Sequence, residues 1–171
     1  MRCFIAIDLP LQVKEEISKI QEKLPEFKGK KTEIENLHLT LKFLGVIDEK
    51  LVEKVKTRLK KIKFKKFEAE ISELGAFRED FVKIVWLKIS GCDELQKIID
   101  SKLEDLFSRE ARFMGHLTIA RVKFCEREEF LSKLKKIKTP RLKFKVENFK
   151  LKKSDLTHGP VYSDLLEVKL N

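Results

Sequence analysis

The 171-residue chain is poor in cysteine, with only three residues of that type. Cys3, Cys92 and Cys125 are odd in number and far apart, so the sequence favours reduced thiols packed as small hydrophobes over a disulfide framework. No CxxC pair is present that would mark a zinc knuckle. We therefore expect neither disulfides nor zinc.

Long hydrophobic runs are lacking as well. No apolar stretch approaches the ~20 residues that cross a bilayer, and the opening "MRCFIAIDLP" has too short an apolar run for a signal peptide. We expect a cytoplasmic protein without membrane contact. Because no Pro/Gly/Ser-rich linker interrupts the chain, residues 1–171 are predicted to form one unit instead of two hinged domains.

What the chain has in abundance is charge. Charged residues make up 39% and hydrophobic residues 42%, including thirteen Phe, which is ample for a core and excludes disorder. The net charge of +10 favours a polyanionic partner, nucleic acid before membrane. A solvated Lys-rich surface, as in thermophile proteins, explains the same charge equally well.

Apolar periodicity predicts a mixture of strands and helices. Strands are expected at 2–8, 37–44, 66–77, 82–90, 116–122, 142–153 and 161–170, and helices at 11–24, 48–62, 93–107 and 126–136. The "IVWL" strand is apolar on both faces, which is typical of a central strand. Asp48 stands in a capping position before its helix.

The order of these elements repeats after 78 residues, dividing the chain into approximate halves 1–78 and 79–156. The shift lays helix 48–62 on 126–140. The pattern predicts an α+β fold of two lobes related by a pseudo-twofold axis, with antiparallel sheets and outer helices. Strand 161–170 is expected to return to the first lobe.

The most informative stretches are "LHLTLKFLG" and "GHLTIARVK", which place two of the three histidines in the same setting. Side chains alternate along a strand, so His38 shares a face with Thr40, and His116 shares one with Thr118. Under the twofold axis the four side chains converge on a central cleft. Two imidazoles can act as general base and general acid in a phosphoester displacement, and two hydroxyls can hold non-bridging oxygens.

A metal site is the competing interpretation of these histidines. Neither has a second ligand three or four residues further on, and no cysteine or acidic cluster flanks them. We therefore expect no metal.

These residues carry a family resemblance. "NLHLTLKFLG" and "HLTIARVK" resemble the two HxTx motifs of the 2H phosphoesterase superfamily, and more closely those of the RNA 2′,3′-cyclic phosphodiesterases, also named 2′-5′ RNA ligases. "RCFIAIDLP" is similar to the family's first strand, "LGAF" with "VWLKI" to its middle strands, and "LKKSDLTHGPVYSDL" to its C-terminal signature. The resemblance thus extends over nearly the whole chain.

The resemblance implies hydrolysis of a terminal 2′,3′-cyclic phosphate to a 2′-phosphate, without cofactor. His38 matches the family's proton donor and His116 its proton acceptor, while Thr40 and Thr118 match its phosphate contacts. Joining of RNA ends through a 2′-5′ bond is also attributed to the family. Gly115 stands where the family usually has proline, and since glycine loosens the backbone we expect weaker activity.

Four further residues are candidate substrate contacts. Lys42 is expected on the open face of the first motif, where it adds positive charge or is simply solvated. Arg121 matches an arginine of the family, yet strict alternation puts it on the opposite face unless a bulge turns it. Phe77 can stack on a nucleobase, whereas Trp86 is expected in the core. Tyr162, from the C-terminal signature, is the fourth candidate.

Two other functions remain open at this point. One is a binding module for a nucleotide or an RNA end that turns over slowly or not at all. The other is a phosphodiesterase for a small cyclic nucleotide. For the favoured function the partner is RNA ending in a 2′,3′-cyclic phosphate, and the protein is expected to be a monomer.

Overall fold

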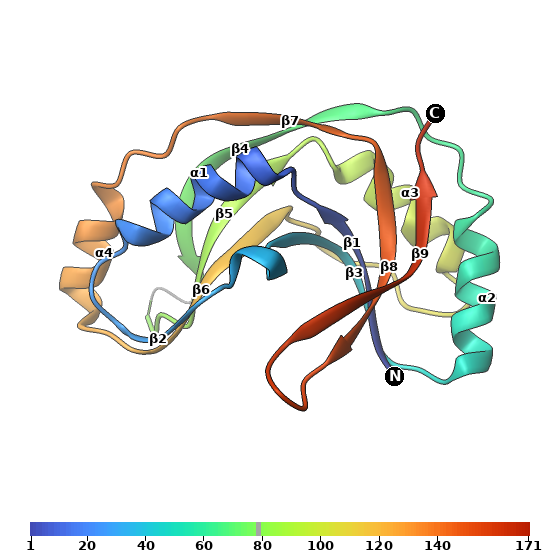
Figure 1. The fold of residues 1–171 in the computed structure, drawn as a ribbon, viewed down its shortest axis with the longest axis horizontal. Helices are drawn as coiled ribbons and strands as arrows, with labels where there is room; N and C mark the ends of the chain where they lie inside the picture. The colour runs from blue at the N-terminus through green and yellow to red at the C-terminus, as the bar shows by residue number, and fades with distance from the viewer. Residues whose placement is uncertain (78–79) are drawn as a thin grey trace.

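The computed structural model describes residues 1–77 and 80–171 (Figure 1). The strands are β1 (Arg2–Asp8), β2 (Lys28–Lys31), β3 (His38–Val46), β4 (Phe67–Phe77), β5 (Ile84–Ser90), β6 (His116–Phe124), β7 (Leu142–Val146), β8 (Asn148–Asp155) and β9 (Val161–Lys169). The helices are α1 (Leu11–Glu22), α2 (Glu49–Leu59), α3 (Asp93–Leu103) and α4 (Arg127–Lys135), with a short 3-10 helix η1 (Ile34–Asn36).

The strands form two antiparallel sheets. One has the order β3-β1-β8-β9 and the other β2-β6-β5-β4-β7. The two His-Thr strands, β3 and β6, lie next to each other where the sheets meet (Figure 1). This arrangement confirms the predicted α+β fold of two lobes, and β5 lies at the centre of its sheet as expected.

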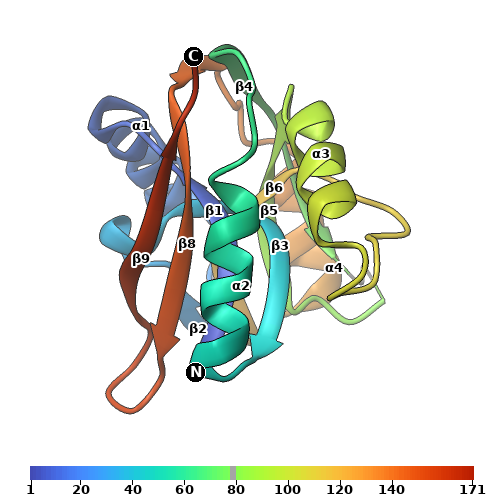
Figure 2. The same ribbon diagram turned by 90° about the vertical axis from the view of Figure 1, so that its right-hand side faces the viewer.

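Each half of the sequence contributes elements to both lobes. Strand β4, from the first half, lies between β5 and β7, whereas β8, from the second half, lies between β1 and β9. The helices follow the same rule, since α1 packs on β6 and α3 packs on β3. Figure 2 shows α2 on the outer side of the lobe that holds β8 and β9. A lobe is therefore not one half of the sequence.

One predicted strand is wrong in its extent. Residues 142–153 form two strands in different sheets, β7 and β8. The buried apolar side chains show the reason, because they stand at even positions up to Val146 and at odd positions from Phe149 to Leu151. The alternation changes phase at Glu147, where the chain passes from one sheet to the other.

Sequence reasoning also missed β2, which pairs with β6 at the edge of the larger sheet. Its residues, KGKK, are all exposed, so no apolar alternation marks it. The expected helices at 11–24, 48–62 and 93–107 end earlier, at Glu22, Leu59 and Leu103.

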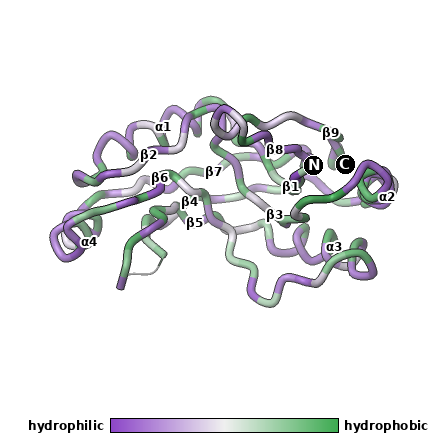
Figure 3. Tube along the Cα trace, turned by 90° about the horizontal axis from the view of Figure 1, so that it is seen from below, coloured by the Kyte–Doolittle hydropathy of each residue, from purple (hydrophilic) through white to green (hydrophobic). Residues whose placement is uncertain are grey.

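The helices cover the sheets with their apolar faces. In α1 the buried side chains are Val13, Ile17, Ile20 and Gln21. Figure 3 shows helices α1, α3 and α4 carrying both hydrophilic and hydrophobic residues, as helices with one buried face do. Asp48 caps α2 as predicted, since its side chain accepts a hydrogen bond from the Leu51 N–H at 2.8 Å.

Cys3 and Cys92 are buried, Cys125 is half-buried, and all three are free. Among the described residues, no helix has the length and apolar character required to span a membrane.

The exchange of strands predicts that neither half of the chain folds alone. Residues 1–78 lack the β8 and β9 that complete the sheet of β1 and β3, and residues 79–171 lack the β4 between β5 and β7. Each fragment is expected to give a poorly dispersed amide NMR spectrum and no cooperative thermal transition. The intact chain is expected to give a well-dispersed spectrum and a cooperative transition. A cooperative transition in either fragment would show that its sheet is stable without the exchanged strands.

Candidate active site

A cavity of about 490 Å³ opens where β3 and β6 meet. His38 and Thr40 line it from one lobe, and His116 and Thr118 line it from the other. The exposed basic residues on its wall are Lys30, Lys31, Arg112 and Arg121, and the buried Lys42 also borders it. The aromatic residues on the wall are Phe43, Phe113 and Tyr162. The predicted convergence of the two motifs is therefore present in the structure.

Both imidazoles are held in the same way. The His38 Nδ1 lies 2.7 Å from the backbone oxygen of Asn36, and the His116 Nδ1 lies 2.8 Å from that of Met114. A carbonyl oxygen can only accept, so Nδ1 carries the proton in each ring. This tautomer leaves Nε2 available for proton transfer, and at His38 Nε2 lies 3.1 Å from the Thr40 hydroxyl.

Each imidazole is also supported by an aromatic ring edge-on. Tyr162 packs on His38 with ring centroids 5.0 Å apart, and Phe77 packs on His116 at 4.9 Å, both at 87°. Phe77 in turn contacts Trp86, which is half-buried. Of the two aromatic candidates, Tyr162 borders the cavity, whereas Phe77 contacts the ring of His116.

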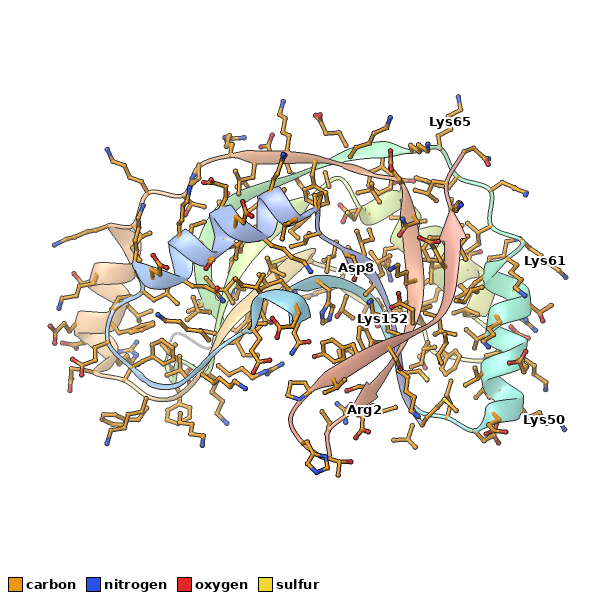
Figure 4. The ribbon with its side chains drawn as sticks, viewed as in Figure 1. Arg2, Asp8, Lys50, Lys61, Lys65 and Lys152 are labelled. Atoms are coloured by element: carbon orange, nitrogen blue, oxygen red, sulfur yellow. The ribbon has the colours of Figure 1, made fainter. Side chains whose placement is uncertain are left out.

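A ring of four alternating charges lies behind His38. Asp8, directly opposite His38 on β1, binds Lys150 at 2.9 Å and Lys152 at 3.0 Å, and both lysines bind Asp164 at 2.7 Å. Figure 4 shows Asp8 and Lys152 close together, whereas Lys50, Lys61 and Lys65 project outward from the edge of the molecule.

The surroundings of His38 favour its neutral form. Burial lowers the pKa of His38 below its ordinary value of 6.5, and the charges of Lys152 and Lys14 act in the same direction. The hydrogen bond to the Asn36 carbonyl and the charge of Asp8 oppose this lowering. Burial would raise the pKa of Asp8, but the hydrogen bonds from Lys150 and Lys152 outweigh it and keep that carboxyl ionised.

The two His-Thr strands have the same pattern of buried and exposed residues and the same irregularity. In β3 the partners of Thr40 and Lys42 are neighbours on β1, and in β6 the partners of Thr118 and Ala120 are neighbours on β5. One extra residue, Leu41 or Ile119, therefore forms a bulge in each strand.

The bulges correct two predictions made from strict alternation. Arg121 is exposed and lines the cavity, instead of facing away from it. Lys42 does not share the open face of His38, because its side chain is only 1% exposed and its ammonium binds Asp100. The position that alternation gave to Lys42 is taken by Phe43, the counterpart of Arg121 in the repeat.

A buried glutamine explains how the second bulge is held. The side-chain amide of Gln21, on α1, donates to the carbonyls of Ile119 and Thr32. The Thr32 N–H also donates to the Ile119 carbonyl, at 2.9 Å. The Ile119 carbonyl, at the bulge, thus has two donors. The corresponding signal in the sequence is a polar residue beside Ile17 and Ile20 on an apolar helix face.

Gly115 is not a loose point in the backbone, contrary to expectation. Its carbonyl accepts the Ile89 N–H at 2.8 Å, and a Cβ built on it would lie 2.3 Å from the Ile89 carbonyl oxygen. Glycine is therefore the residue that lets β5 approach the start of β6, just before His116.

Several residues near the cavity were not found from the sequence. Lys30, Lys31 and Arg112 lie in stretches without a motif, and only the fold brings them together. Asn36 stands beside the first motif and joins it to the turn before β9, since its amide donates to the Pro160 carbonyl at 3.0 Å. Within residues 1–77 and 80–171, no three His, Cys, Asp or Glu side chains are grouped as metal ligands would be.

A bilobal fold with two imidazole–hydroxyl pairs on one basic cavity defines a class of protein suited to phosphate esters. The family model described as LigT-like phosphoesterase matches residues 7–86 and again residues 90–162. The chain therefore belongs to the LigT-like phosphoesterase family, and each half of the sequence matches the model separately.

Proteins named RNA 2′,3′-cyclic phosphodiesterase are similar over almost the full length. The one from Methanocaldococcus jannaschii is 38% identical, with 98% of this chain and 99% of that protein covered. The one from Thermotoga maritima is 34% identical, with 98% and 94% covered. A crystal structure from Thermus thermophilus has a TM-score of 0.81 at 27% identity, with 99% and 97% covered.

The enclosure of His38 predicts its titration. In the free protein His38 is expected to titrate below pH 6.5, because burial disfavours its cation. Addition of inorganic phosphate should raise this pKa, because an anion in the cavity stabilises the imidazolium. The measurement is a pH titration of the imidazole NMR signals, assigned with His38→Gln. Titration at or above 6.5 without phosphate would contradict the assignment of His38 to a desolvated site.

Proposed function

We propose that this protein hydrolyses the 2′,3′-cyclic phosphate at the 3′ end of RNA to a 2′-phosphate by metal-independent acid–base catalysis. The observation that carries the proposal is the pair of imidazoles bordering one cavity, each with Nδ1 fixed by a carbonyl and Nε2 available. The names of the similar proteins support the RNA substrate.

In the proposed reaction a water oxygen attacks the phosphorus and the P–O3′ bond breaks. His116, neutral at Nε2, takes the proton of the attacking water. His38, protonated at Nε2, gives a proton to the departing O3′. The proton count balances, and exchange with solvent restores the starting states.

The remaining cavity residues fit the charge of this substrate. Thr40 and Thr118 would donate hydrogen bonds to the non-bridging phosphate oxygens. Arg121 would add a charge-assisted hydrogen bond, and Lys30 and Lys31 would attract the preceding phosphates of the RNA strand. Tyr162 would bound the space for the terminal nucleotide.

Ligation follows from the same geometry if a 5′ hydroxyl takes the place of water. Because water is far more concentrated than an RNA end, hydrolysis is the principal reaction that we propose. The cytoplasmic location and the monomeric state stay predictions.

The proposal predicts a product. With a short RNA ending in 2′,3′-cyclic phosphate, and in EDTA, the protein is expected to release only the 2′-monophosphate, distinguished from the 3′ isomer by chromatography. His38→Ala and His116→Ala should each lower kcat by about 10²- to 10⁴-fold, the usual contribution of one acid–base group. Both variants should keep the thermal transition of the parent, because neither side chain belongs to the core.

Each other outcome identifies a different function. Binding of the RNA without turnover would indicate a binding module, and turnover of mononucleoside 2′,3′-cyclic phosphates in preference to RNA would indicate a small-molecule phosphodiesterase. Full activity in both histidine variants would refute the acid–base assignment.

The two histidine roles are separated by changing the leaving group. A substrate with sulfur in place of O3′ needs little protonation on departure, so it should restore most of the activity of His38→Ala and little of that of His116→Ala. The comparison is the ratio of kcat for the sulfur and oxygen substrates in each variant. Preferential recovery of His116→Ala would reverse the assignment.

A further inference from the structure

A buried ion pair joins β3 to α3 on the core side of the first motif. The Lys42 Nζ lies 2.5 Å from the Asp100 carboxylate, and the two side chains are only 1% and 5% exposed. In the repeat the position of Lys42 is filled by Ala120, which is also buried. Apolar residues often stabilise such a position equally well, so stability alone does not account for the pair.

The pair holds the backbone of the segment that follows α3. The Lys42 ammonium donates to the Ser108 carbonyl at 2.7 Å, and Asp100 accepts the Glu110 N–H at 2.9 Å. Gln96 donates a further hydrogen bond to Asp100. Burial would raise the pKa of Asp100, but the hydrogen bonds from Lys42, the Glu110 backbone and Gln96 keep it lowered, so the carboxylate stays charged.

This segment, residues 108–114, forms much of one cavity wall and leads into β6. Glu110, Arg112, Phe113 and Met114 all line the cavity. The Met114 carbonyl accepts the Nδ1 proton of His116 and thereby sets the tautomer and direction of that ring. The position of the segment therefore bears directly on where the Nε2 of His116 points.

We propose that Lys42 and Asp100 are positioning residues, which fix segment 108–114 on the first lobe and so orient His116 on the second. The role rests on the hydrolysis proposed above, in which His116 is the proton acceptor. The ion pair acts through the backbone and does not contact the substrate.

The test is the double variant Lys42→Met/Asp100→Asn, which removes both charges and leaves neither stranded. Nitrogen NMR of the imidazoles reports the tautomer of each neutral histidine. The Nδ1–H tautomer of His116 is expected to give way to a mixture with the Nε2–H form. His38 should keep its tautomer, because its acceptor, the Asn36 carbonyl, belongs to another segment.

The kinetic expectation concerns kcat more than KM. A misdirected general base lowers the rate of the bound complex, so kcat should fall about 10- to 100-fold. The control for lost stability is Val55→Ala, in the buried face of α2, which should lower the thermal midpoint without changing the His116 tautomer or kcat.

A second variant tests the same contact without touching the core. Glu110→Pro removes the N–H that Asp100 accepts, and Glu110→Ala removes only the side chain. The proline variant should reproduce the change in the His116 tautomer, and the alanine variant should not. This pair of variants decides the question if the double variant fails to fold.

An unchanged His116 tautomer and kcat in both Lys42→Met/Asp100→Asn and Glu110→Pro would overturn the proposal and leave the pair a purely structural feature. A tautomer change in a protein that hydrolyses no cyclic phosphate would refute the proposed function and keep the positioning role. The two failures are therefore distinguishable.

Discussion

The structure depends on an exchange of strands, in which each half of the chain places one central strand in the sheet of the other half. β8 separates β1 from β9, and β4 separates β5 from β7, so each sheet needs hydrogen bonds from both halves. The helices reinforce the exchange, because α1 packs on β6 and α3 on β3. A cavity that takes one motif from each lobe is stable only if the lobes cannot move apart, and the exchanged strands and helices provide that rigidity.

Much of this organisation is visible in the sequence, for a physical reason. Apolar alternation is local, so short stretches of sequence are enough to predict the His-Thr strands and the face shared by His38 and Thr40. The similarity of the two halves is visible in the same way. Strand partners are not local. From the sequence alone, the residues on either side of Glu147 are predicted as one strand, although they belong to two sheets. The strand Lys28–Lys31 is fully exposed, so no buried face marks it in the sequence.

The bulges show the same limit within the candidate site. An extra residue in a strand is defined by the partner strand, so alternation within β6 alone placed Arg121 on the wrong face. The same shift moved Lys42 from the predicted cavity face to the core. The sequence thus indicates the chemistry of these residues but not the extra residue in each strand. That extra residue decides which cation faces the cavity and can reach a phosphate.

The repeat supplies two equivalent imidazoles, yet acid–base catalysis needs them in opposite protonation states. The difference must come from what surrounds each ring. His38 lies against Phe4 and Tyr162, and burial favours its neutral form, whereas the hydrogen bond of His116 to Met114 is exposed. An anionic diester entering the cavity would offset the cost of charging His38. In the proposed reaction His38 therefore takes up its proton when the substrate binds. The protonated imidazole is then the general acid next to the departing O3′.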